Sequence, residues 1–184
     1  MGRIEELADK FGIYLELPPS GIGLAAERVL MVVYDEDLER TFRERVVEFE
    51  IRTTTAGRKW KQLDCTGIFS DWMTQLDYRE SYFAEPEHLG TKIEGEFKKV
   101  VVNRLRAALQ GMDAGSVLAV TGIASLYGFV RFSEIIREVD ADIRGCLAVF
   151  FPGTKDKSNY RLLDARDGWN YLAHSISLHS EGAN

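Results

Sequence analysis

The chain has 184 residues, of which 45% are hydrophobic and 28% are charged, and its formal net charge is -6. This length and ordinary composition exclude a disordered or fibrous protein and predict one globular domain. The excess of acid opposes non-specific binding to nucleic acid. Two cysteines, Cys65 and Cys146, are too few for a disulfide framework and lack the spacing of zinc ligands. We therefore expect no metal and no other cofactor.

No apolar run approaches the length of about 20 residues that spans a bilayer. The first ten residues, MGRIEELADK, carry acids and lack the apolar core of a secretory signal. We therefore expect a soluble protein of the cytoplasm that makes no contact with a membrane.

The first half of the chain predicts a strand and a helix in succession. Val29–Tyr34 (VLMVVY) is a short apolar run, typical of a strand that is covered on both faces of a parallel sheet. Asp35–Ile51 follows with apolar residues at helical spacing and three acids in its first turn, where the helix dipole favours negative charge. Thr53–Gly57 is expected to end this helix. Two weaker elements come next, a strand at Trp60–Cys65 and a short helix at Gly67–Leu76.

The second half repeats this alternation. Tyr78–Glu87 is aromatic and acidic and is expected to form a loop or a broken helix. His88–Met112 carries a continuous apolar stripe and predicts the longest helix. The later elements are a strand at Val117–Val120, a helix running into Ile135, Ile136 and Val139, a strand at Cys146–Phe151 that Pro152 and Gly153 stop, a short strand around Arg161–Leu163, and a final helix or edge strand around Tyr171–Ser177.

Strands that alternate with helices form βαβ units and therefore a mainly parallel sheet. The sequence predicts an α/β fold: a single domain over residues 1–184, with a mainly parallel sheet of four to five strands and helices on both faces. Residues 1–28 are expected to add an N-terminal helix and loop, and residues 160–184 a C-terminal edge segment and tail.

Motifs for phosphate binding and catalysis are incomplete. Gly21–Ala26 (GIGLAA) has the letters of a dinucleotide fingerprint, but it precedes a strand instead of following one, so a loop is expected. No Walker A loop is present, and the glycines around Ser125 lack the spacing of a nucleophile elbow. Asp35 ends a buried strand, where parallel sheets place ligand groups, but an aspartate there is also a good helix N-cap. The sequence predicts a protein that is not an enzyme.

A basic run occupies residues 52–61 (RTTTAGRKWK). One interpretation is a solvated loop that joins two elements. The alternative is a nucleotide- or nucleic-acid-binding domain, in which these side chains contact phosphate. The basic residues in question are Arg52, Arg58, Lys59 and Lys61.

The most specific pattern lies between about Val117 and Ala173. A predicted strand leads into Thr121–Arg131 (TGIASLYGFVR); Phe150–Gly153 (FFPG) and Tyr160–Leu163 (YRLL) follow later in the chain. This succession resembles the BrxB family, a component of the BREX bacteriophage-exclusion systems of bacteria. The first half of the chain agrees with that family mainly in the order of its elements.

Two positions depart from the family pattern. Gly128 stands where the family usually has proline, and Asn170–Ala173 (NYLA) lacks the arginine of the family, which indicates a divergent member. The resemblance implies a non-catalytic component of phage defence, an assembly or adaptor protein that binds a larger, alkaline-phosphatase-like protein called PglZ. It also implies contacts with other components of that system and only an indirect connection with DNA.

The family-motif residues have two possible roles. Thr121 and Gly122 lie at the carboxyl end of a strand, where α/β sheets form their binding crevice, and a glycine there suits a positive φ or a close approach of another backbone. The alternative is that this set only maintains the fold, with an arginine tying down a loop. The remaining family-motif residues are Arg131, Pro152, Gly153 and Arg161.

Aromatic residues near these motifs are candidates for contact with a protein partner, because interface anchors are enriched in tryptophan, tyrosine and arginine. Trp169 is the strongest of them, since polar residues flank it. We expect Arg131 to be structural and Trp169 to lie closer to an interface. The other candidates are Tyr127, Tyr160 and Tyr171.

Overall fold

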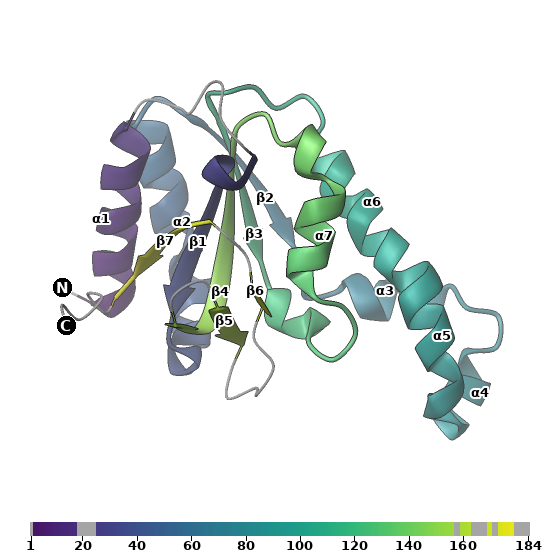
Figure 1. Ribbon diagram of the computed structural model, residues 1–184. Helices are drawn as coiled ribbons and strands as arrows, with labels where there is room; N and C mark the ends of the chain where they lie inside the picture. Colours follow the sequence, from purple (N-terminus) through teal and green to yellow (C-terminus); the bar gives the residue numbers. More distant parts are fainter. Residues whose placement is uncertain (1, 18–24, 157–158, 163–168, 171–172, 179–184) are drawn as a thin grey trace.

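The computed structural model describes residues 2–17, 25–156, 159–162, 169–170 and 173–178 (Figure 1). Its centre is a sheet of five parallel strands in the order β2-β3-β4-β1-β7, to which β5 and β6 add a short antiparallel extension. The strands are β1 (Val29–Tyr34), β2 (Lys59–Asp64), β3 (Ser116–Thr121), β4 (Cys146–Asp156), β5 (Asn159–Leu162), β6 (Trp169–Asn170) and β7 (His174–Ser177). The predicted α/β fold with a mainly parallel sheet is confirmed.

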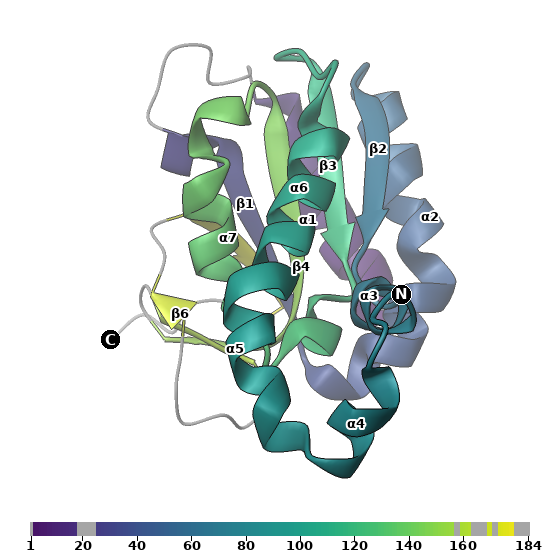
Figure 2. The ribbon, with the colours of Figure 1, turned by 90° about the vertical axis from the view of Figure 1, so that its right-hand side faces the viewer.

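Helices cover both faces of the sheet (Figures 1 and 2). The helices are α1 (Arg3–Glu16), α2 (Glu39–Thr55), α3 (Ile68–Thr74), α4 (Arg79–Ala84), α5 (Gly90–Lys92), α6 (Lys98–Leu109) and α7 (Phe132–Glu138). Short turns of 3-10 or π type are η1 (Ala25–Arg28), η2 (Glu36–Leu38), η3 (Pro86–Leu89), η4 (Ile93–Phe97), η5 (Ile123–Leu126) and η6 (Asp140–Asp142). Among the described residues, no helix has the length and apolar character needed to cross a membrane.

Each face of the sheet has its own apolar core. Helices α1 and α2 pack on one face, where Phe42 and Phe49 each lie 4.9 Å, ring centre to ring centre, from Phe150 of β4. Helices α3, α6 and α7 pack on the other face, where Phe97 and Trp72 are buried. Every residue of β1 and β3 is buried, as expected for strands covered on both sides.

Helix α2 ends at Thr55, within the predicted break at Thr53–Gly57. Thr53 is buried, and its hydroxyl donates a hydrogen bond of 2.8 Å to the Phe49 carbonyl one turn earlier, so a residue with low helix propensity fits inside the helix. The chain then leaves the helix at Gly57, which has a φ of +74°.

The predicted long helix over His88–Met112 is present in segments. From Gly90 to Leu109 the chain is helical throughout, but Ile93–Phe97 forms a π-turn between α5 and α6. The apolar residues here recur every four positions, which drifts around a regular helix of 3.6 residues per turn. The wider π-turn offsets part of this drift and keeps the apolar stripe against the core.

The prediction that Pro152 and Gly153 stop the fourth strand is wrong, because β4 continues to Asp156. Its partners change at this point. Up to Pro152 the strand pairs in parallel with β1, and from Gly153 it pairs antiparallel with β5. A Cβ on Gly153 would lie 2.1 Å from the carbonyl oxygen of Arg161, so glycine is needed for β5 to approach.

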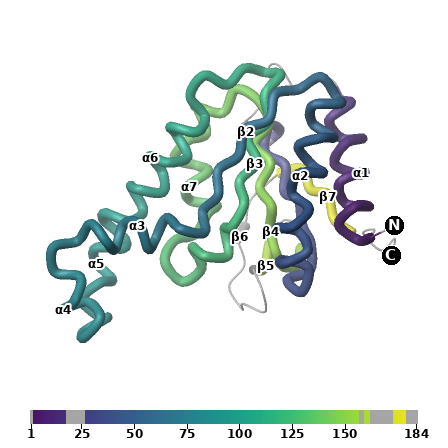
Figure 3. The backbone as a smooth tube through the Cα atoms, turned by 180° about the vertical axis from the view of Figure 1, so that it is seen from behind, coloured from purple at the N-terminus to yellow at the C-terminus, as the bar shows by residue number. Residues whose placement is uncertain are grey.

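The chain from residue 77 to residue 92 forms an arm that extends away from the sheet, past the carboxyl ends of the strands (Figures 2 and 3). It holds α4, η3 and α5, so the predicted broken helix in its first part is confirmed. Most of its residues are exposed; Leu89 is buried and Tyr82 packs partly against the core, which fixes the arm to the domain.

Candidate functional site

A small cavity of about 150 Å³ lies at the carboxyl ends of β2 and β3, the edge where α/β sheets bind ligands. Strands β2 and β3 and the turns after them form one side, and helix α2 forms the other. The lining residues are Phe42, Arg43, Val46, Gln62, Asp64, Thr66, Thr121 and Gly122.

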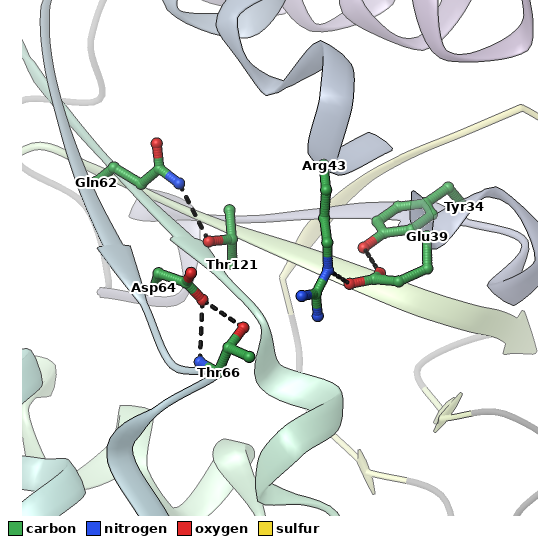
Figure 4. Close-up of polar contacts among 7 residues, drawn as sticks. All are labelled: Tyr34, Glu39, Arg43, Gln62, Asp64, Thr66 and Thr121. Atoms are coloured by element: carbon green, nitrogen blue, oxygen red, sulfur yellow. Dashed lines mark hydrogen bonds and ion pairs between the residues drawn. The ribbon is translucent and has the colours of Figure 1, made fainter. Parts of the chain in front are cut away.

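The two turns after these strands are held together by polar contacts (Figure 4). Asp64 accepts hydrogen bonds through one carboxylate oxygen from the backbone N–H and the hydroxyl of Thr66, at 2.9 and 2.6 Å. The amide of Gln62 donates to the Thr121 hydroxyl at 3.3 Å, and the backbone N–H of Cys65 donates to the Thr121 carbonyl at 2.9 Å. These contacts fix the carboxyl ends of β2 and β3 in place.

Gly122 has both features that favour a glycine, a positive φ and a close approach of another backbone. Its φ is +69°, in the left-handed region, and a Cβ there would lie 2.8 Å from the backbone nitrogen of Thr66. A glycine is therefore required by backbone conformation and by space at once. This role is structural and belongs to the fold.

Across the cavity, Glu39 at the start of α2 contacts Tyr34 at the end of β1 and Arg43 one turn later in α2 (Figure 4). Its carboxylate accepts a 2.5 Å hydrogen bond from the Tyr34 hydroxyl and a 2.7 Å bond from Nε of Arg43. Burial and the bond to Glu39 raise the pKa of Tyr34 far above its usual value. The bond to Glu39 also raises the pKa of Arg43, and the negative charge of Asp64 adds to this, so Arg43 faces the cavity as a fixed cation.

The size of the cavity limits what it can hold. Small-molecule sites usually have volumes of about 300–1,000 Å³, well above this one. An arginine and an aspartate at the mouth of a small recess suit one polar side chain or one backbone group of a protein partner. Within the described ranges, no group of three histidine, cysteine or acidic residues is placed to hold a metal.

Neither cysteine is suited to nucleophilic chemistry. Both side chains are buried, and burial raises the pKa of each thiol to about 12, for Cys65 and for Cys146 alike. At neutral pH both are therefore protonated, whereas nucleophilic attack requires the thiolate.

Asp35 forms an ion pair with Arg3 of α1. It occupies the N-cap position of η2, but its side chain makes no capping hydrogen bond there. The predicted capping role of this side chain is therefore wrong, because the carboxylate pairs with a cation of another helix. Residues 21–24 of the GIGLAA motif lie outside the described residues.

The remaining family-motif residues divide between core and surface. Pro152 and Gly153 are buried in β4, where the strand changes partners. Arg131 and Arg161 are exposed. The backbone carbonyl of Arg131 accepts the first hydrogen bond of α7, from Glu134 N–H at 2.9 Å.

The aromatic partner candidates do not share one environment. Tyr127 is 46% exposed. Tyr160 is only 1% exposed, and its ring centre lies 5.8 Å from that of Phe151, so it is a core residue and not a surface anchor. Trp169 belongs to β6 by its backbone, and its side chain lies outside the described part of the chain, as does all of Tyr171.

The basic residues proposed for phosphate contact make contacts within the chain. Arg52 pairs with Asp9 of α1 at 2.6 Å, and Lys59 pairs with Asp113 at 2.5 Å. Arg58 donates to the carbonyls of Leu15 and Leu17 at 3.0 and 2.6 Å, which satisfies acceptors at the carboxyl end of α1. Lys61 lies 3.5 Å from the Gln110 carbonyl. These contacts give the basic run a structural role.

The arm is a surface that sequence reasoning did not single out. Tyr78 is 75% exposed and Phe83 is 65% exposed, the former just before α4 and the latter within it. Residues 77–87 carry four acids against one base. The aromatic and acidic composition of this segment could have indicated a binding surface. A sequence pattern does not show, however, which of its aromatic side chains the core covers.

The root of the arm, formed by Phe69 and Phe97 in the chain on either side of it, contacts the Thr121–Arg131 segment. Phe69 of α3 stacks on Phe129 with ring centres 4.0 Å apart, and Phe97 meets the same Phe129 ring edge-on at 6.1 Å. Phe129 follows Tyr127 by two residues. The chain on both sides of the arm therefore packs on the Thr121–Arg131 segment.

Comparison of the chain with protein-family models, with curated proteins and with solved structures found no match.

Proposed function

We propose that this chain is a non-catalytic component of a BREX-type phage-defence system, an assembly or adaptor protein that binds a larger PglZ-like protein. The sequence resemblance over Val117–Ala173 supports the assignment to a BREX-type system. The arm supports a binding role, because it presents two large aromatic side chains, Tyr78 and Phe83, to solvent. This exposure is the observation that carries the proposal.

Exposed aromatic residues are costly to leave in water and are the residues most enriched at the centres of protein interfaces. The arm surrounds them with acids: Asp77, Glu80, Glu85 and Glu87. Charge complementarity therefore favours a partner surface that is apolar at its centre and basic around it.

The contact between Phe129 and the root of the arm gives the family-motif segment a part in this role. The Thr121–Arg131 segment supports the base of the arm from one side, and Tyr127 in the same segment is itself half exposed. A partner that docks on the arm would meet Tyr127 as a neighbouring contact at the same end of the domain. The small cavity beside Arg43 and Asp64 lies at this end too and would receive a polar group of the partner.

Co-purification with the PglZ-like protein of the same system tests the proposal. The unmodified chain is expected to form a complex at micromolar concentration. Replacing both Tyr78 and Phe83 by alanine should weaken binding at least tenfold while the melting temperature changes little, since neither side chain is buried.

A matched control replaces two exposed apolar residues of α2, Val47 and Ile51, which are each 51% exposed and lie on the outer face of that helix. This double variant should bind like the unmodified chain. If no complex forms at micromolar concentration, the PglZ-like protein is not the partner. If both double variants weaken binding equally, the arm is not the docking surface.

A further inference from the structure

A second and larger cavity, of about 460 Å³, lies at the amino-terminal ends of the strands, at the edge of the sheet opposite to the arm. Every parallel strand contributes a lining residue at or just before its first position. These are Arg58 before β2, Ala114 before β3, Arg144 before β4, Arg28 before β1, and His174 at the start of β7. The parallel register of the five strands gathers these residues from distant parts of the chain.

The lining is strongly basic in a chain that is acidic as a whole. Three arginines, Arg28, Arg58 and Arg144, line the cavity, and Glu27 is the one acid among its described lining residues. An adjoining cavity shares Arg58 and adds one base and one acid, Arg52 and Glu16. A hollow lined by one sign of charge focuses the electric field and attracts ligands of the opposite sign.

The floor of the cavity is tightly built. A Cβ on Gly145 would lie 2.2 Å from the Ser116 carbonyl oxygen and 2.5 Å from that of Asp113, so the start of β4 packs directly on the turn before β3. The carbonyls of Leu15 and Leu17 orient the Arg58 guanidinium and use two of its five N–H donors. The Arg58 guanidinium and the backbone beside Arg144 therefore have little freedom to move.

One wall of the cavity is aromatic. The rings of Tyr14 and His174 lie 5.9 Å apart, centre to centre, at an angle of 52°. Leu17 and Cys146 add apolar surface beside them. A cavity lined by cations and by two flat rings suits a ligand that has an anionic part and a planar part.

We propose that this cavity binds a nucleoside phosphate, with its phosphate groups among Arg28, Arg58 and Arg144 and its base beside Tyr14 and His174. The volume falls within the usual range for small-molecule sites. Guanidinium groups match phosphate oxygens in charge and in fork geometry. The site lies at the opposite edge from the crevice where α/β sheets ordinarily bind nucleotides, and it is independent of the arm and its partner.

Isothermal titration with ADP tests the site. One equivalent of ADP is expected to bind the unmodified chain with a saturable isotherm. Arg144→Glu should weaken that binding at least tenfold, and Arg144→Lys should weaken it less, because lysine keeps the positive charge but lacks the guanidinium fork. Arg144 is exposed, so both variants are expected to fold, which their thermal melts will show.

Arg40→Glu is the matched control, since it makes the same change of charge at the opposite edge of the sheet, on a side chain that is 92% exposed. It should leave ADP binding unchanged. Pyrophosphate should bind more weakly than ADP; equal affinities overturn the assignment of the base to Tyr14 and His174. No saturable binding of ADP up to millimolar concentration, or equal weakening by Arg40→Glu, overturns the site.

Discussion

A Cβ atom on Gly122 would lie 2.5 Å from Oδ1 of Asp64, because the turn after β3 passes directly over the turn after β2. The same carboxylate oxygen accepts two hydrogen bonds from Thr66, so it has no freedom to move aside. The tight packing of these two turns closes the carboxyl edge of the sheet beside the small cavity.

Gly122→Ala is expected to destabilise the fold by at least about 2 kcal/mol, since a left-handed φ alone costs an alanine about 1–2 kcal/mol and the contact with the second turn adds to it. Gly128→Ala is the control. Gly128 also has a positive φ, of +82°, but no atom lies within 4 Å of its Cβ position, so the cost should stay near 1 kcal/mol. Urea denaturation of both variants measures the difference, and equal losses would show that the close approach contributes nothing.

Gly128→Pro tests the departure from the BrxB pattern. Proline fixes φ near -65°, which is incompatible with the +82° found at this position. The variant should therefore be less stable than Gly128→Ala, by thermal melting under the same conditions. A proline variant as stable as the parent would mean that the turn can adopt a backbone conformation that proline allows.

Arg58→Ala is expected to cost about 1–3 kcal/mol, because it leaves the carbonyls of Leu15 and Leu17 without their charged donor. Lys61→Ala is the matched control from the same basic run. Its side chain is exposed and makes one long contact, so its effect should remain within about 0.5 kcal/mol. Chemical denaturation followed by circular dichroism compares them; equal effects would contradict a specific role for Arg58.

The two buried thiols predict a loss of stability at alkaline pH. Both have a pKa of about 12 in the folded chain, raised from 9.0, so the folded state holds these protons more tightly than the unfolded state. Their contribution is complete below pH 9 and is lost as the pH rises from 9 towards 12. The urea midpoint should fall over this range, and less steeply when both cysteines are replaced by alanine.

A thiol reagent gives an independent measurement at pH 8. Neither Cys65 nor Cys146 should react in the folded chain, and both should react in concentrated urea. Fast reaction of either thiol without denaturant contradicts its burial.

Elements with a strong apolar pattern could be predicted from sequence closely. The strand at Val29–Tyr34 has the predicted limits, and the strand around Val117–Val120 extends by one residue at each end. Both are continuous apolar runs, so burial on two faces was the only arrangement that suited them. The continuation of β4 beyond Pro152 was missed because proline and glycine usually signal a turn, whereas here they allow the strand to exchange one partner for another.

Side-chain environments were less accessible to sequence reasoning. Tyr160 and Tyr127 are the same type of residue and both lie in family motifs, yet Tyr160 is buried and Tyr127 is exposed. The difference depends on β5, which pairs with β4 and turns Tyr160 towards Phe151. Long-range pairing of this kind leaves no local pattern in the sequence. The cavity at the amino ends was missed for the same reason, since its lining comes from five separate strand starts.

Strand β2 is the outer strand of the sheet, and four of its six residues are exposed. An open strand edge is a template on which other chains can add strands and aggregate. Here Lys59, Lys61 and Asp64 place charged side chains along that edge, and two of them also hold neighbouring turns. These charges oppose pairing of β2 with other chains, and replacement of both lysines by apolar residues is expected to favour edge-to-edge assembly in concentrated protein.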